Sequence, residues 1–190
     1  MKKILLIIVI VLLIAIGWFA WKNSGTQTIP DPNKDEALKQ AAVTVSAEPL
    51  TQTYTNSTYH ITFKYPASFI VNESNLDGQS VIVVRNPQNN IGFQITVTPF
   101  EDTDYNVDAA RVKKEIPDMT VNEPRDILLG PIGKGVAFIS SEEGIETREI
   151  WFAVPNKDAG AAAPGWLYQI TAPISFDGVV QAVMNTWQFQ

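Results

Sequence analysis

The stretch IGFQITVTP, residues 91–99, decides the expected fold, because large apolar residues alternate with small or polar ones along it. The apolar positions are Ile91, Phe93, Ile95 and Val97. A period of two residues is typical of a β-strand with one buried face. Pro99 lacks a backbone N–H, so we expect the strand to end there.

The residues on either side extend this β pattern. Residues 81–84 are all β-branched, and the NPQNN sequence at 86–90 has the composition of a turn, so a hairpin is predicted here. Residues 59–65 alternate in the same way, and Pro66 follows them. Further strands are expected at residues 127–129, 135–140, 145–154 and 166–171.

Two stretches predict helices. Asn106 is the expected N-cap of a helix over residues 107–116. Ser175 is the expected N-cap of a second helix, whose apolar residues form one continuous face. These residues are Phe176, Val179, Val180, Val183, Met184 and Trp187. Strands outnumber helices, so the sequence predicts an α+β fold, with a largely antiparallel sheet and helices packed on it.

The chain begins with a segment that we interpret as a membrane anchor. Two lysines precede an uninterrupted apolar run over residues 4–21, and Lys22 follows it. As a helix this run would be roughly 27 Å long, close to the roughly 30 Å hydrocarbon core of a bilayer. We expect residues 1–22 to form one transmembrane helix that contacts the lipid bilayer through residues 4–21. Cleavage as an export signal is the alternative and would give a secreted protein.

Composition divides the rest of the chain in two. Residues 23–53 are rich in Thr, Gln, Ser, Ala and Pro, which is typical of a flexible linker, and residues 54–190 are then the folded domain. Without residues 1–22 the chain has 11 basic and 20 acidic residues, a formal net charge of −9. A short basic tail before an apolar run is typical of exported proteins, so we place the domain outside the cytoplasm, at the cell membrane.

The two ends of the folded domain resemble a known family. YTNSTYHITFKYP, residues 54–66, is similar to the opening of PsbP-like domains, the superfamily of a photosystem II extrinsic subunit. Residues 176–189, a predicted helix followed by the aromatic-rich sequence TWQF, are similar to the end of these domains. The resemblance implies an α/β/α sandwich around an antiparallel sheet, an accessory or binding role, and no enzymatic activity.

The composition of the full chain excludes several kinds of site. There is no Cys, so disulfides, thiol catalysis and cysteine metal sites are excluded. The single His, His60, excludes any site that needs two imidazoles, and we interpret it as an exposed strand residue. The net charge of −6 argues against a nucleic acid as partner.

One acidic segment has the composition of a cation site. Asp102, Asp104, Asn106 and Asp108 alternate like the ligands of a calcium loop, and carboxylate oxygens suit a hard cation. The EF-hand pattern fails, because Val107 stands where Gly is needed. The alternative is an acidic approach to a helix N-terminus, where negative charge is favourable. Calcium is the only cofactor that the sequence suggests.

Two further features are candidates for chemistry. Trp166 follows the loop-like sequence at 156–165 and is a candidate binding contact, with a buried core Trp as the alternative. A group of glutamates flanks the hairpin predicted between residues 135 and 154 and could hold a carboxylate pair, although a solvated strand edge is the simpler interpretation. These glutamates are Glu142, Glu143, Glu146 and Glu149.

Three hypotheses about function follow. The first is a membrane-anchored, extracytoplasmic accessory or binding module without a catalytic site, whose partner is an envelope protein or another ligand. The second is a cell-envelope domain stabilised by calcium or another metal. The third is a carboxylate-based hydrolase that acts on cell-envelope polymers. We favour the first, because the sequence predicts an anchor, a linker and a domain but contains no recognisable set of catalytic residues.

Overall fold

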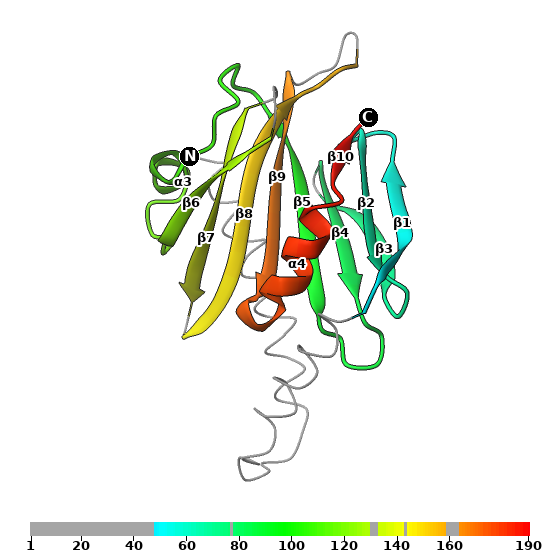
Figure 1. The fold of residues 1–190 in the computed structure, drawn as a ribbon. Helices are drawn as coiled ribbons and strands as arrows, with labels where there is room; N and C mark the ends of the chain where they lie inside the picture. Colours follow the sequence, from blue (N-terminus) through cyan, green and yellow to red (C-terminus); the bar gives the residue numbers. More distant parts are fainter. Residues whose placement is uncertain (1–47, 77, 130–132, 143, 159–163) are drawn as a thin grey trace.

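The computed structural model describes residues 48–76, 78–129, 133–142, 144–158 and 164–190 (Figure 1). These residues form ten strands, arranged in two antiparallel sheets. The predicted anchor, residues 1–22, and residues 23–47 of the predicted linker lie outside the described residues. Within the described part of the chain, no helix has the length and apolar character needed to cross a bilayer.

The larger sheet has seven strands in the order β3-β4-β5-β9-β8-β7-β6 (Figure 1). Their bounds are β3 (Ile70–Leu76), β4 (Gln79–Arg85), β5 (Gly92–Phe100), β6 (Asn122–Leu128), β7 (Lys134–Glu142), β8 (Ile145–Pro155) and β9 (Gly165–Pro173). The predicted hairpin is confirmed, because β4 and β5 pair and the Asn86 N–H donates to the Ile91 carbonyl across the turn, at 2.9 Å.

The predicted end of β5 at Pro99 is wrong, because the strand continues to Phe100. Val97 is the last β5 residue that pairs with β4, and from there on β5 pairs with β9 alone. A proline interrupts a strand by removing a ladder hydrogen bond, and it is tolerated where one side of the strand has no partner. Pro99 therefore lies where its missing N–H disrupts the hydrogen bonding of the sheet least.

The smaller sheet shares one face of the larger sheet with a helix. This sheet has the order β1-β2-β10, with bounds β1 (Leu50–Asn56), β2 (Ile61–Pro66) and β10 (Gln188–Phe189). Helix α4 (Asp177–Met184) follows a 3-10 turn over Ile174–Phe176 and lies beside the small sheet (Figure 1). The predicted apolar face is confirmed in part, since Phe176, Val179, Val180 and Val183 are buried. The N-cap is Phe176 rather than Ser175, and no side chain caps the helix.

Apolar side chains pack on both faces of the large sheet. The front core joins the small sheet and α4 to the large sheet: the Phe63 ring lies 6.3 Å from that of Phe93 and stacks on Trp187 at 5.2 Å. The back core joins the short helix α3 (Ala109–Glu115) to the other face. Its fully or largely buried residues are Phe100, Val107, Val112, Val136, Phe138, Trp151 and Ala153.

The α+β prediction is wrong, because the described residues are mostly strand. Their α-helices, α3 and α4, have seven and eight residues. Helix α3 begins at Ala109 and is capped by Asp108 rather than Asn106, and α4 ends before Trp187. The α/β/α sandwich is also wrong, because a second sheet shares the front face with α4. Both helices are held to the sheet by short apolar faces. Strands such as β1 and β6 have no clear alternation of apolar and polar residues, and they join the sheets by backbone pairing.

Candidate binding site

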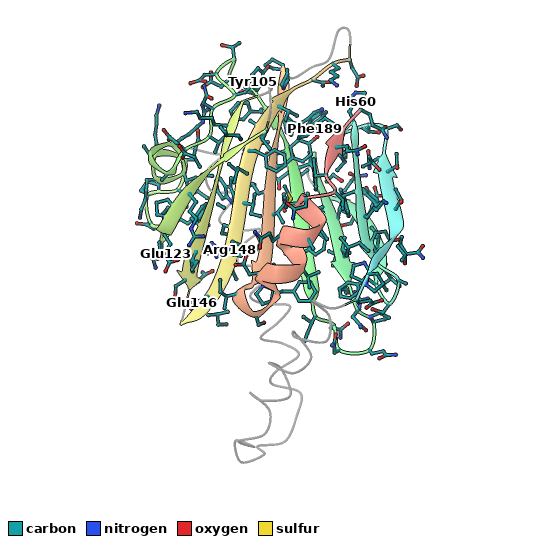
Figure 2. The ribbon with its side chains drawn as sticks, viewed as in Figure 1. His60, Tyr105, Glu123, Glu146, Arg148 and Phe189 are labelled. Atoms are coloured by element: carbon teal, nitrogen blue, oxygen red, sulfur yellow. The ribbon has the colours of Figure 1, made fainter. Side chains whose placement is uncertain are left out.

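A small pocket opens at the end of the molecule where β8 ends and β9 begins. It has a volume of about 30 Å³ and is lined by Tyr59, His60, Trp166, Phe189, Lys157 and the Val154–Pro155 end of β8. Figure 2 shows His60 and Phe189 together at this end, with Glu146 at the opposite end of the molecule. Aromatic rings and aliphatic groups form the walls, and His60 and Lys157 supply the polar groups.

The first wall is the turn between β1 and β2, and backbone contacts hold it in place. His60 has a φ of 54°, a left-handed conformation that is uncommon for a residue other than glycine. The His60 carbonyl accepts a hydrogen bond from the Gln190 N–H at 2.8 Å, and the Tyr168 hydroxyl donates to the Tyr59 carbonyl at 2.6 Å. The interpretation of His60 as an exposed strand residue is wrong, because it lies in a turn and its side chain is about a quarter exposed.

The second wall is Trp166, on β9. Its ring meets that of Tyr59 edge to face, with centroids 5.0 Å apart and planes at 88°. The backbone beside it is anchored by the Tyr105 hydroxyl, which donates to the Pro164 carbonyl at 2.7 Å. The Trp166 indole nitrogen is buried, and no described residue accepts a hydrogen bond from it. Trp166 lines the pocket, and its side chain is half-buried rather than freely exposed. Its role as a binding contact stays a prediction.

The rim of the pocket carries charged groups. His60 Nε2 lies 3.0 Å from Asp158 Oδ1. Lys157 Nζ donates to the backbone carbonyl of Gln190. These contacts tie the residues after β8 to the β1–β2 turn and to β10, so three distant parts of the sequence meet at one site.

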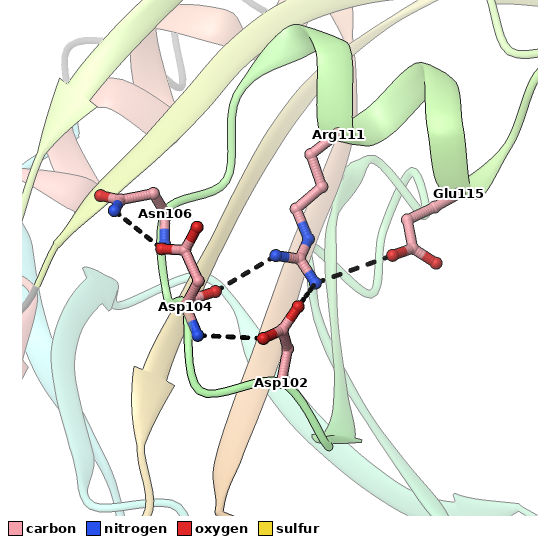
Figure 3. Close-up of polar contacts among 5 residues, drawn as sticks. All are labelled: Asp102, Asp104, Asn106, Arg111 and Glu115. Atoms are coloured by element: carbon pink, nitrogen blue, oxygen red, sulfur yellow. Dashed lines mark hydrogen bonds and ion pairs between the residues drawn. The ribbon is translucent and has the colours of Figure 1, made fainter.

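The acidic segment forms a compact loop whose oxygens already accept hydrogen bonds (Figure 3). Asp102 Oδ1 accepts from the Asp104 N–H at 3.0 Å, and Asp104 Oδ1 accepts from the Asn106 side chain at 2.8 Å. Asp108 caps α3 by accepting from the Arg111 N–H at 2.7 Å. The predicted ligands are therefore close in space, but they turn towards N–H groups of the loop and of α3.

The Arg111 side chain supplies a positive charge to this acidic loop. Its guanidinium lies 2.9 Å from Asp102 Oδ2 and 3.8 Å from Glu115 Oε1, and it also donates to the Asp104 carbonyl (Figure 3). The Asp104 N–H, together with Arg111, holds the pKa of the Asp102 carboxyl below its usual range. Among the described residues there is no group of three or more His, Asp or Glu side chains suited to a metal ion.

Glu149 is the buried titratable group that the sequence did not reveal. It lies in β8 and is 4% exposed, so the interpretation of this residue as part of a solvated edge is wrong. Its carboxylate accepts from the Thr171 and Thr147 hydroxyls at 2.8 and 2.9 Å and from the Trp151 indole at 3.3 Å. Burial raises the pKa of the Glu149 carboxyl, although these hydrogen bonds act in the opposite direction.

No protein-family model and no curated protein matches the chain. The function proposed below is therefore argued from the geometry of the structure.

Proposed function

We propose that this protein is a membrane-anchored, extracytoplasmic binding module whose ligand site is the pocket between Tyr59 and Trp166. The observation that carries the proposal is the pocket itself, where the β1–β2 turn, the end of β8, the start of β9 and β10 meet around aromatic rings and the side chains of His60 and Lys157. Binding sites are typically concave and mostly apolar, with a few polar groups that fix the orientation of the ligand.

The rigidity of the site supports a binding role. The β1–β2 turn is fixed by Tyr168 and Gln190, and the start of β9 is fixed by Tyr105. A preformed pocket binds without a large entropic cost of ordering its walls. Its polar groups differ in chemistry and do not form a pair of facing carboxylates, which is the arrangement that the hydrolase hypothesis needs.

The sequence supports the location of the module. Residues 4–21 would hold the protein in the bilayer, and the linker would let the domain stand away from it. The folded domain, residues 54–190, has a formal net charge of −7 and is repelled by anionic lipid headgroups, so its binding site faces partners other than the membrane surface.

Site-specific photo-crosslinking in intact membranes tests this function. A photoreactive residue in place of Pro155, at the pocket, should give a crosslinked adduct in the membrane fraction. The same residue in place of Glu146, exposed at the other end of β8, should not. Equal adducts at both positions, no adduct at Pro155, or recovery of the intact chain from the soluble cytoplasmic fraction would contradict the proposal.

A further inference from the structure

We infer that the open edge of β3 binds an extended segment of a partner protein, and that this segment carries a lysine or arginine opposite Glu73. The segment would pair with β3 through backbone hydrogen bonds and become an additional strand of the large sheet. This surface is separate from the pocket and goes beyond the proposed function. The inference follows from the regularity of the edge, the backbone groups on its open side, and the position of its charge.

β3 differs from the other edge strands in that nothing along it blocks pairing. Proteins usually protect sheet edges with prolines, lysines, bulges or very short strands. β6, the opposite edge of the large sheet, contains Pro124 and a bulge between Asn122 and Arg125. In the small sheet, β1 has a bulge near its start and β10 has two residues. β3 pairs with β4 over seven residues in unbroken register and contains neither proline nor lysine.

The open side of β3 presents the backbone groups of alternate residues. Leu76 pairs with Gln79, and a connection this short closes with a hydrogen-bonded pair. Because hydrogen-bonded and non-hydrogen-bonded pairs alternate along an antiparallel ladder, Val71, Glu73 and Asn75 direct their N–H and C=O groups away from β4. No strand of the described chain pairs with β3 on that side, and residues 72–75 are exposed (Figure 1). An extended segment can therefore reach all three residues.

Glu73 is the only charged residue of β3 and the middle one of these three residues. Its Oε2 accepts a hydrogen bond from the Asn56 side chain at 3.2 Å, and no lysine or arginine of the described chain forms an ion pair with it. Unlike charges directly opposite each other stabilise a strand pair, and like charges destabilise it. A lysine or arginine opposite Glu73 therefore strengthens the pairing.

The same residue disfavours a second copy of this chain as the occupant. Two antiparallel β3 strands that pair through Val71, Glu73 and Asn75 of each copy place the two Glu73 side chains directly opposite each other. The net charge of −7 on each folded domain adds to this repulsion. The edge therefore suits a basic segment of another protein better than it suits itself.

The test is an NMR titration of the full-length chain in detergent micelles with the synthetic peptide Ac-TVTKTVT-amide. Its central lysine would lie opposite Glu73. The peptide should move the backbone amide signals of Val71, Glu73 and Asn75 in a saturable way and slow their hydrogen exchange. The amide signals of β6, the edge with the proline and the bulge, should stay in place.

Two matched changes to the peptide test the kind of contact. Glutamate in place of the central lysine should weaken binding about fivefold, because like charges then lie opposite each other. N-methylation of the central lysine, whose N–H would face β3, should abolish binding. N-methylation of the threonine before it, whose N–H would face away from β3, should preserve binding.

A charge reversal in the protein tests the role of Glu73. Glu73→Lys should reverse the preference, so that the glutamate peptide binds more tightly than the lysine peptide. The matched control is Glu146→Lys, which changes an exposed glutamate on β8 and should leave the preference for lysine unchanged.

Four outcomes would overturn the inference. If no peptide moves the β3 signals, or if the two N-methylated peptides bind equally, this edge does not pair with an added strand. If the lysine and glutamate peptides bind equally, the partner is not selected by its charge. If the wild type alone forms dimers in analytical ultracentrifugation, with its β3 amides protected from exchange, the occupant is a second copy. The crosslinking experiment at Pro155 tests the pocket separately, so the proposed function stands or falls independently of these results.

Discussion

The ionisation of the buried Glu149 carboxyl is coupled to the stability of this fold. Glu149 lies on the back face of the large sheet, and its four described partners are all neutral: Ser140, Thr147, Trp151 and Thr171. With no described cation to offset its burial, its pKa in the folded protein lies above the ordinary value of 4.5. The folded state therefore holds a proton that the unfolded chain releases as the pH rises.

This difference predicts how stability depends on pH. The free energy of unfolding should be highest below about pH 4.5 as far as Glu149 is concerned, and should fall as the pH rises from there towards the raised pKa. Glu149→Gln removes the titration, so its unfolding free energy should decline less between pH 4 and pH 7 than that of the wild type. Denaturant unfolding followed by tryptophan fluorescence measures this. Glu146→Gln, exposed on the same strand, should follow the wild-type curve. Parallel curves for wild type and Glu149→Gln would show that the buried carboxyl does not control this dependence.

Glu149 also shows why the burial of a single residue could not be predicted from the sequence. Its neighbours along the chain, Arg148 and Ile150, gave no sign that its own face of β8 is covered. The burial comes from the back core and from Thr171 across the β8–β9 pairing, neither of which is local in sequence. The loop-like sequence before Trp166 made this residue a candidate contact, which stays a prediction, whereas the local sequence did not indicate that Tyr59 packs against it.

At the scale of elements, the pairing of Arg148 with Asp177 connects α4 to β8. Arg148 Nε and Nη2 donate to the two carboxylate oxygens of Asp177 at 2.8 and 3.0 Å, and the Arg148 side chain is 11% exposed. Asp177 is the first residue of α4, where a negative charge also favours the helix dipole. Since α4 has no side-chain N-cap, this ion pair is the main polar contact that fixes its start.

A double-mutant cycle tests this connection. Asp177→Asn should destabilise the protein by about 1–3 kcal/mol, because it leaves the mostly buried guanidinium without its counter-charge. Arg148→Met combined with Asp177→Asn should cost less than the sum of the single changes. The matched control is the exposed pair of Arg125 with Glu123, 3.8 Å apart, whose coupling should be under about 0.5 kcal/mol. Additive effects at Arg148 and Asp177 in urea unfolding would contradict the assigned role.

The elements differ in how well the sequence predicted them. Strands with a strong apolar pattern, such as β4, β5 and β8, were predicted close to their observed bounds. β6 is the opposite case: its seven residues are almost all exposed and include a proline, so its strand structure comes from pairing with β7. The predicted fold class was wrong for the same reason. Local sequence patterns do not show how many further segments become strands by pairing with a neighbouring strand.

At the scale of the whole molecule, β8 makes the two cores one cooperative unit. Ile150, Phe152 and Val154 enter the front core, and Trp151 and Ala153, which alternate with them, enter the back core. Seven successive residues of this strand are buried, which is typical of a strand covered on both faces. Loss of either core should therefore release the same strand, so the two faces should not unfold independently.

Matched truncations on the two faces test this cooperativity. Phe152→Ala in the front core and Phe138→Ala in the back core each remove a fully buried ring, and each should cost about 3–5 kcal/mol of unfolding free energy. Both variants should still unfold in a single transition, with tryptophan fluorescence and far-ultraviolet circular dichroism giving the same midpoint. Separate midpoints in the Phe138→Ala variant, with the signal from the front core persisting to higher denaturant, would mean that the α3 side of the sheet unfolds by itself. In that case β8 would not couple the two faces, and the pocket at its end could stay formed after the back core is lost.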